Sequence, residues 1–197
     1  MKTTPETRTA IIRMRHPLRH AVLFIMGLAM ASCSAPKARV GAPATAGKVD
    51  LARYTGRWHE IARLPTPFQK DDDTAIADYG MNADGTVSVH NIAVRADGKQ
   101  RGIKGSARVL NPPANTKLAV RFSTWFGPLI PMPKDGNYWI LHVDDNYQEA
   151  IVGTPDRRFL WLLARTPQIS AQRKAALVAR AEALGFDVER MVTTQRQ

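Results

Sequence analysis

The chain has 197 residues, of which 44% are hydrophobic and 23% are charged, and its formal net charge is +11. These proportions are typical of a globular protein and exclude a disordered or fibrous chain. The basic residues are scattered among acids, without a block of five or more Lys and Arg. The sequence therefore predicts no nucleic-acid partner, and a weak attraction to anionic membrane surfaces is the simpler consequence of its charge.

Residues 1–32 have the three parts of a secretory signal peptide. A basic segment leads into the apolar run AVLFIMGLAMA (residues 21–31), which is too short to cross a bilayer as a helix. The following motif MASC resembles a bacterial lipobox. It implies that residues 1–32 are removed and that the acylated Cys33 anchors the protein in the outer membrane, facing the periplasm. A signal peptide cleaved nearby, which leaves Cys33 as a free thiol, is the alternative.

The segment after the cysteine is rich in small residues, Pro and Gly and has no periodicity. We therefore expect residues 33–48 to form a flexible tether and residues 49–197 to form the folded domain. Cys33 is the only cysteine, so the sequence predicts a domain without a disulfide.

The domain begins with a series of short alternating runs that are separated by turn signals. This pattern predicts antiparallel strands, because no helical crossover separates one run from the next. After the first run, GRWHEIAR (56–63), the others are TAIADYGM (74–81), TVSVHNIAV (86–94), GIKGSARVL (102–110), TKLAVRFSTW (116–125), NYWILHVD (137–144), YQEAIVG (147–153) and RFLWLLART (158–166).

The last long segment changes to helical spacing. In SAQRKAALVARAEALG (170–185), Leu177, Ala181 and Leu184 recur at helical intervals, Ser170 is the expected N-cap and Gly185 the expected stop. Eight strands and one helix predict an all-β fold. It is an eight-stranded antiparallel up-and-down β-barrel with one C-terminal α-helix packed outside.

The residues on the inward faces of the strands favour a cavity. Ala75, Ala77 and Ala107 are small and leave space, while Val120 and Phe122 make the interior apolar. An eight-stranded barrel has room for one small ligand or for side chains alone. A barrel filled by its larger side chains, as in a structural envelope protein, remains the alternative.

The direction of the strands brings three distant segments to one end of the barrel. Trp58 begins the first strand, the turn Asp144–Tyr147 follows the sixth, and Arg165 ends the eighth. We expect Trp58 to close this end and Arg165 to stack on its indole through a cation–π contact.

These segments also carry a family resemblance, which covers about residues 49–192. GRWHEIARLP resembles the Gly-x-Trp signature of the lipocalins, and NYWILHVDDNYQEAIVGTPDRRFLWLLARTP is similar to the two remaining signatures. Together with VDLARYTGRW, the lipobox indicates the bacterial outer-membrane lipocalins of the apolipoprotein D-like branch. The resemblance implies storage or transport of fatty acids or lysophospholipids, and it implies a possible homodimer.

The resemblance also assigns roles to individual residues. Asn146 stands where the family usually has Asp, and Asp144 or Asp145 is close enough to replace that carboxylate. Barrel-closing roles are implied for Gly56, Trp58, Tyr147 and Arg165. The alternation and the resemblance together give ten expected ligand-binding residues: Ala75, Ala77, Tyr79, Val89, Asn91, Ala107, Val120, Phe122, Trp139 and Leu141.

One loop at the opposite, open end is unusually apolar for a surface segment. It contains Phe126, Leu129, Ile130 and Met132. An exposed apolar patch is typical of a contact with a membrane, a ligand or a partner. A portal loop that touches the bilayer and a lid that folds over the mouth are both compatible with this composition.

The sequence offers little support for an enzyme. Strand alternation places His59, His90 and, if Trp139 points inward, His142 on the outer surface, so we expect no metal site, cofactor or catalytic residue. Glu60 shares the inward parity of Trp58, but it has no visible catalytic partner. A barrel-based enzyme that acts on a lipid or another apolar substrate is the second alternative.

Overall fold

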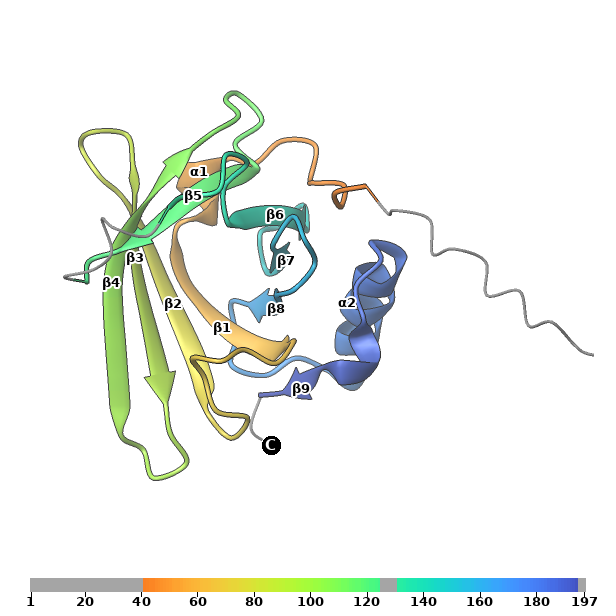
Figure 1. The fold of residues 1–197 in the computed structure, drawn as a ribbon. Helices are drawn as coiled ribbons and strands as arrows, with labels where there is room; N and C mark the ends of the chain where they lie inside the picture. The colour runs from red at the N-terminus through yellow and green to blue at the C-terminus, as the bar shows by residue number, and fades with distance from the viewer. Residues whose placement is uncertain (1–40, 125–130, 195–197) are drawn as a thin grey trace, which may run out of the picture. The chain divides into compact units, whose positions relative to one another are not determined.

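The computed structural model describes residues 41–124 and 131–194. Their strands form one sheet in the order β2-β3-β4-β5-β6-β7-β8-β1-β9, and β1 also pairs with β2, which closes the first eight strands into a barrel (Figure 1). The predicted eight-stranded antiparallel up-and-down barrel is therefore confirmed. The strands are β1 (Gly56–Arg63), β2 (Thr74–Met81), β3 (Val87–Val94), β4 (Gln100–Val109), β5 (Lys117–Phe122), β6 (Tyr138–Val143), β7 (Glu149–Gly153), β8 (Leu160–Ala164) and β9 (Val192–Thr193).

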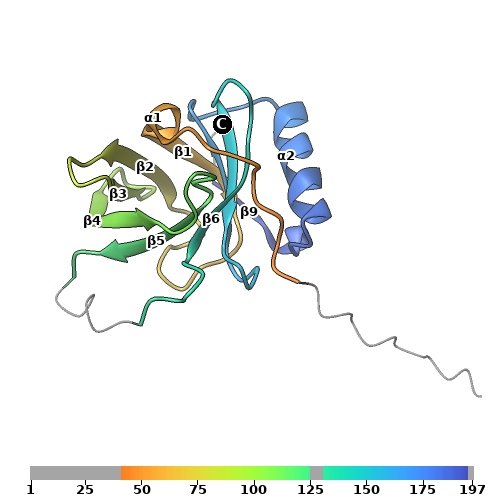
Figure 2. The same cartoon turned by 90° about the horizontal axis from the view of Figure 1, so that it is seen from above.

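Helices flank the barrel at both ends of the described chain. The short α1 (Leu51–Tyr54) precedes β1, α2 (Ala171–Ala183) follows β8, and a 3-10 turn, η2 (Val188–Arg190), leads into β9. The hydroxyl of Ser170 caps α2 by accepting a hydrogen bond from the amide of Arg173. Figure 2 shows α2 outside the barrel wall. None of the helices within residues 41–124 and 131–194 has the length and apolar character needed to cross a membrane.

The barrel wall next to α2 is buried on both faces. One hydrophobic cluster fills part of the barrel interior and includes Trp58, Ile140 and Leu163. A second cluster lies between the wall and the helix and includes Leu162 and Leu177. Because successive side chains of a strand point to opposite faces, β6, β7 and β8 supply residues to both clusters. This arrangement explains why their sequences are apolar without interruption.

Two register shifts change the course of individual strands. In β1 the pairing with β8 shifts between Glu60 and Ala62, and in β6 the pairing with β7 shifts between Ile140 and His142. The first half of β1 pairs with β2, whereas its last two residues pair with β9. A shift of this kind reverses the face to which all later side chains of the strand point.

The seam between β5 and β6 is the weakest part of the wall. Only Lys117 and Leu118 pair with β6 there. The carboxamide of Asn137 extends the seam, because it donates to the carbonyl of Val120 at 3.0 Å and accepts from the Val120 amide at 2.8 Å. A side chain thus replaces missing backbone pairs of the ladder.

The same seam explains why part of the expected tether is ordered. Residues 41–48 were expected to be flexible, but the amide of Ala46 donates to the carbonyl of Ile140 at 3.0 Å, and Pro43 is buried. Thr116 also donates its hydroxyl to Thr45 at 3.2 Å. Backbone groups that β5 and β6 leave unpaired bind this segment, so the packed domain extends beyond the boundary predicted at residue 49.

The packing of α2 predicts a large effect from one truncation. Leu177 is 3% exposed, so Leu177→Ala should lower the free energy of unfolding by about 2–5 kcal/mol, through lost burial and the cavity left behind. The control is Gln172→Ala on the exposed face of the same helix, which should change it by less than about 0.5 kcal/mol. Urea unfolding of both variants measures the difference, and equal stabilities would contradict docking of α2 on the wall.

Candidate functional site

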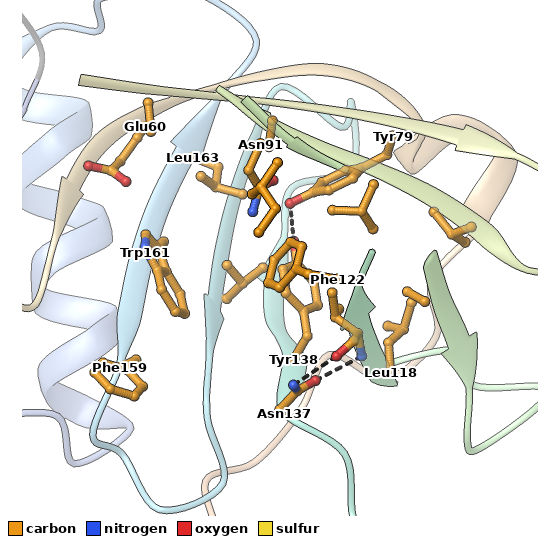
Figure 3. A pocket seen from close by; sticks show the side chains of 18 of the residues that line it. Glu60, Tyr79, Asn91, Leu118, Phe122, Asn137, Tyr138, Phe159, Trp161 and Leu163 are labelled. Atoms are coloured by element: carbon orange, nitrogen blue, oxygen red, sulfur yellow. Dashed lines mark hydrogen bonds between the residues drawn. The ribbon is translucent and has the colours of Figure 1, made fainter. Parts of the chain in front are cut away.

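The barrel encloses a cavity of about 990 Å³ (Figure 3). This volume is at the upper end of the range of roughly 300–1,000 Å³ for small-molecule sites. The alternative of a barrel filled by its own side chains therefore does not describe the structure. Eight of the ten expected ligand-binding residues line the cavity: Ala75, Ala77, Tyr79, Val89, Asn91, Ala107, Val120 and Phe122.

The other two expected residues, Trp139 and Leu141, point away from the cavity, contrary to the expectation. Both belong to the cluster between the barrel wall and α2. The indole nitrogen of Trp139 donates to the carbonyl of Asp135 at 2.6 Å, and Lys117 lies over its ring. Both faces of β6 are apolar and buried, so its sequence pattern could not show which face lines the cavity.

The register shift in β6 has a second consequence. His142 was expected to face outward only if Trp139 faced inward, yet both face away from the cavity. The shift after Ile140 breaks the simple alternation between these two positions. Burial lowers the pKa of His142, and the nearby positive charge of Arg180 on α2 acts in the same direction.

Several residues that line the cavity were not identified from the sequence. Tyr138 replaces Trp139 as the inward residue of β6, and Trp161 enters from β8. Among the others are Tyr54, Asn137, Val152, Phe159 and Leu163. The alternation of β8 alone indicates Trp161 and Leu163 as one face, but not which face is inside. Tyr54 belongs to α1, where strand alternation says nothing.

One end of the barrel is closed by Trp58, which is fully buried. The guanidinium carbon of Arg165 lies 3.8 Å from the centroid of the indole, and the indole nitrogen donates to the carbonyl of Tyr54 at 2.8 Å. Arg165 also donates to the carbonyls of Arg53 at 2.8 Å and Arg57 at 2.9 Å. A planar, multiply donating cation therefore fixes both the indole and the chain that leads into β1.

The other two barrel-closing residues, Gly56 and Tyr147, lie beside the stack of Arg165 on Trp58. Gly56 has a φ of +96°, and a Cβ there would lie 3.3 Å from Nη1 of Arg165. Glycine is thus needed both for the backbone conformation and for the close approach. Tyr147 accepts a hydrogen bond from the amide of Asp50 at 2.8 Å, and its ring lies under Arg53.

The carboxylate of Asp144 caps the turn that follows β6. Its oxygens accept from the amides of Asn146 at 3.2 Å, Gln148 at 2.6 Å and Glu149 at 2.5 Å. These three bonds hold the turn after β6 in the conformation that presents Tyr147 to α1. That this carboxylate takes the part of the Asp usual in the family stays a prediction.

Three tyrosine hydroxyls meet inside the closed end of the cavity. The hydroxyls of Tyr54 and Tyr138 are 2.8 Å apart. Figure 3 shows the next bond, in which Tyr138 donates to Tyr79 at 3.2 Å. Burial raises the pKa of Tyr79 to about 12, and it also raises the pKa values of Tyr54 and Tyr138. All three hydroxyls therefore remain protonated near neutral pH. The cluster is polar but uncharged.

A buried ionic group lies beneath the loop that connects β1 to β2. Glu60 is 5% exposed, and its carboxylate accepts from the side-chain amide of Gln69 at 3.0 Å. Nε of Arg63 lies 3.4 Å from the same oxygen, and Arg63 donates to the carbonyl of Lys70 at 2.7 Å. The pair fastens the loop to the barrel, which is a structural role for the residue considered as a catalytic base.

The open end of the cavity is bordered by aromatic and polar residues. The rings of Phe68 and Phe159 lie 5.7 Å apart, and Arg101 and Asp156 line the same region. Met132 is half-buried. The other residues of the expected portal loop, Phe126, Leu129 and Ile130, lie outside the described residues, as does Cys33.

Residues 41–124 and 131–194 contain no group of three or more His, Cys, Asp or Glu side chains placed to hold a metal ion. His90 faces Gly102 on the outer surface of the barrel, since a Cβ on that glycine would lie 2.6 Å from its Nε2.

The closure predicts that arginine cannot be replaced by lysine at position 165. Arg165→Lys keeps the charge but loses the planar stack and most of the donors, so the free energy of unfolding should fall by about 2–4 kcal/mol. Arg108→Lys, an exposed change on β4, should stay within about 0.5 kcal/mol of the unsubstituted chain. Thermal and urea unfolding measure both variants, and similar losses for the two would contradict the closing role.

The buried carboxyl group predicts a pH dependence of stability. Burial raises the pKa of Glu60 from 4.5 to about 7, so the folded state binds a proton more tightly than the unfolded state does. Stability should therefore fall as the pH rises from about 4.5 to 7, by an amount on the order of 1–3 kcal/mol. Glu60→Gln should remove this slope in urea unfolding across the same pH range. Parallel curves for the two proteins would refute it.

Comparison with known proteins gives the family. Residues 49–196 match the model of the lipocalin-like domain. Temperature-induced lipocalin-1 of Arabidopsis thaliana is 38% identical, over 74% of this chain and 78% of its own length. Outer membrane lipoprotein Blc of Escherichia coli K12 is 34% identical, over 84% and 89%, and mouse apolipoprotein D is 31% identical, over 75% and 77%. Insecticyanin of the tobacco hornworm shares the fold, with a TM-score of 0.58 at 21% identity, over 80% of this chain and 85% of its own.

Proposed function

The chain belongs to the lipocalin-like family, in the group of bacterial outer-membrane lipoproteins and apolipoprotein D, and on this basis we propose that it binds a fatty acid or a lysophospholipid in its barrel for storage or transport. The interior cavity carries this proposal. A single long-chain lipid suits a space that is enclosed by the barrel, mostly apolar and supplied with a few polar side chains.

The distribution of polar residues around the cavity supports an amphiphilic ligand. Its middle is lined by apolar side chains such as Val89, Val120 and Leu163, while Arg101 and Asp156 border the open end. An acyl chain lies in the apolar section, because each buried methylene contributes about 0.8 kcal/mol. A phosphate-bearing head group stays at the open end, where water and charged side chains solvate it.

The anchor belongs to the same proposal. Cys33 follows a signal-peptide-like segment, and the relatives from Escherichia coli and Vibrio cholerae are named outer membrane lipoproteins. We propose that acylated Cys33 holds the barrel at the outer membrane on the periplasmic side. There the barrel exchanges ligands with the bilayer, and residues 34–40 connect it to the anchor.

Native mass spectrometry of the full chain, titrated with palmitic acid and with lysophosphatidylethanolamine, tests the proposal. We expect saturable binding of one lipid per barrel and release of the lipid unchanged. A lipid released in chemically altered form would favour the enzyme, and no binding of either lipid would refute the carrier. The same spectra distinguish a monomer from a homodimer.

A further inference from the structure

The hydrogen bonds of the tyrosine cluster leave one donor unused. Tyr54, Tyr79 and Tyr138 have one hydroxyl proton each, and two hydrogen bonds join the three oxygens. Since each bond uses one proton, the third proton has no partner within the cluster. Tyr138 uses its proton to donate to Tyr79, so the bond between Tyr54 and Tyr138 must use the proton of Tyr54. The hydroxyl proton without a partner in the cluster is therefore that of Tyr79.

A second polar group without a partner lies nearby on the same inner face. Asn91 Oδ1 is buried, and no donor among the described residues reaches it. Ala77 pairs with Asn91 and Tyr79 pairs with Val89, so Asn91 and Tyr79 are diagonal neighbours across β2 and β3. Side chains in this relation are within reach of a common small group. An unsatisfied buried amide is costly, which favours a ligand group that completes its hydrogen bonds.

The closed end provides no cation for a charged head group. The lining residues include one cationic side chain among the described residues, Arg101, which donates to the carbonyl of Phe68 in the loop between β1 and β2 at the open end. Arg165 is close to Trp58 but does not line the cavity. A carboxylate or phosphate buried beside the tyrosines would be uncompensated, whereas a hydroxyl or a carbonyl group needs only hydrogen bonds.

These observations lead to an inference that rests on the proposed function and adds the orientation and class of the ligand. We infer that Tyr79 and Asn91 form a subsite for the uncharged oxygenated end of a long-chain lipid, which enters head first with its chain toward the open end. Tyr79 donates to the oxygen of this group, and the carboxamide of Asn91, which lines the cavity beside it, turns its unpaired Oδ1 toward the ligand to accept its hydrogen. Long-chain alcohols, monoacylglycerols and protonated fatty acids have this chemistry, and phospholipid head groups do not.

The position of two tryptophans allows the orientation to be measured. Trp58 closes the barrel beside Tyr54, with 5.1 Å between their ring centroids. Trp161 lies toward the open end, where its ring is 6.1 Å from that of Phe159. A nitroxide on a bound lipid quenches the fluorescence of a nearby indole. The part of the quenching that is lost in Trp161→Phe therefore reports which end of the lipid is near the mouth.

The first experiment uses the full chain with Trp125 and Trp139 replaced by Phe, so that Trp58 and Trp161 are its two indoles. The ligands are stearic acids that carry a nitroxide near the chain end or near the carboxyl group, at a pH where the acid is protonated. We expect the chain-end label to quench Trp161 and the carboxyl-end label to quench mainly the signal that remains in Trp161→Phe. The reverse pattern would overturn the head-first orientation and leave the carrier function intact. Absence of quenching by either label would overturn both.

The second experiment tests the residues by competition with octadecanol. Tyr79→Phe and Asn91→Leu should each weaken its binding by about tenfold, the equivalent of one lost buried hydrogen bond. Asn82→Leu is the matched control, since it removes an exposed carboxamide from the turn between β2 and β3, outside the cavity lining, and it should leave the affinity unchanged. Binding of lysophosphatidylcholine should be unaffected in all three variants.

Thermal unfolding of each variant separates a local effect from loss of the fold. If Tyr79→Phe is unstable because Tyr138 loses its acceptor, Asn91→Leu still decides the question, because no donor among the described residues reaches Asn91 Oδ1. Unchanged affinity for octadecanol in a folded Asn91→Leu protein would overturn the subsite.

Discussion

The stacking of Arg165 on Trp58 is the contact on which the ligand site depends. An eight-stranded barrel has two open ends, and a cavity that holds a lipid needs one of them closed. Here a fully buried indole closes it, and a guanidinium 3.8 Å from its ring centroid binds carbonyls on the segment that leads into β1. This contact joins the start of β1 to the end of β8 at the closed end of the barrel. The tyrosine cluster lies next to it, on the cavity side of Trp58.

An interior left open for a ligand cannot supply the whole core of the domain. Buried apolar contact is the main source of folding free energy, and an empty cavity lacks part of it. The second hydrophobic cluster, between the barrel wall and α2, supplies this contact outside the barrel through residues such as Leu162, Leu177 and Phe186. Stability and ligand space are thus separated onto the two faces of β6, β7 and β8.

The polar groups of the cavity wall and of the loop beside it are arranged in two ways with different consequences. Glu60, Arg63 and Gln69 bind one another and the loop after β1, so they serve the structure. Tyr79 and Asn91 are incompletely paired and face the cavity, so they are available to a ligand. Glu60, Tyr79 and Asn91 look alike in sequence, as inward polar positions of the adjacent strands β1, β2 and β3, but they differ in function because of what their neighbours leave unpaired.

The sequence by itself determined the strands, their order and the meeting of Trp58 with Arg165, because alternating strand direction follows from short turns alone. It also determined most of the cavity wall, since alternation along β2 to β5 has one apolar face. Only the tertiary structure decided that Tyr138 and not Trp139 lines the cavity, because α2 buries the outer face of β6 and a register shift breaks its alternation. It likewise decided the hydroxyl chain, in which Tyr54 reaches the cavity from a helix that no strand pattern describes.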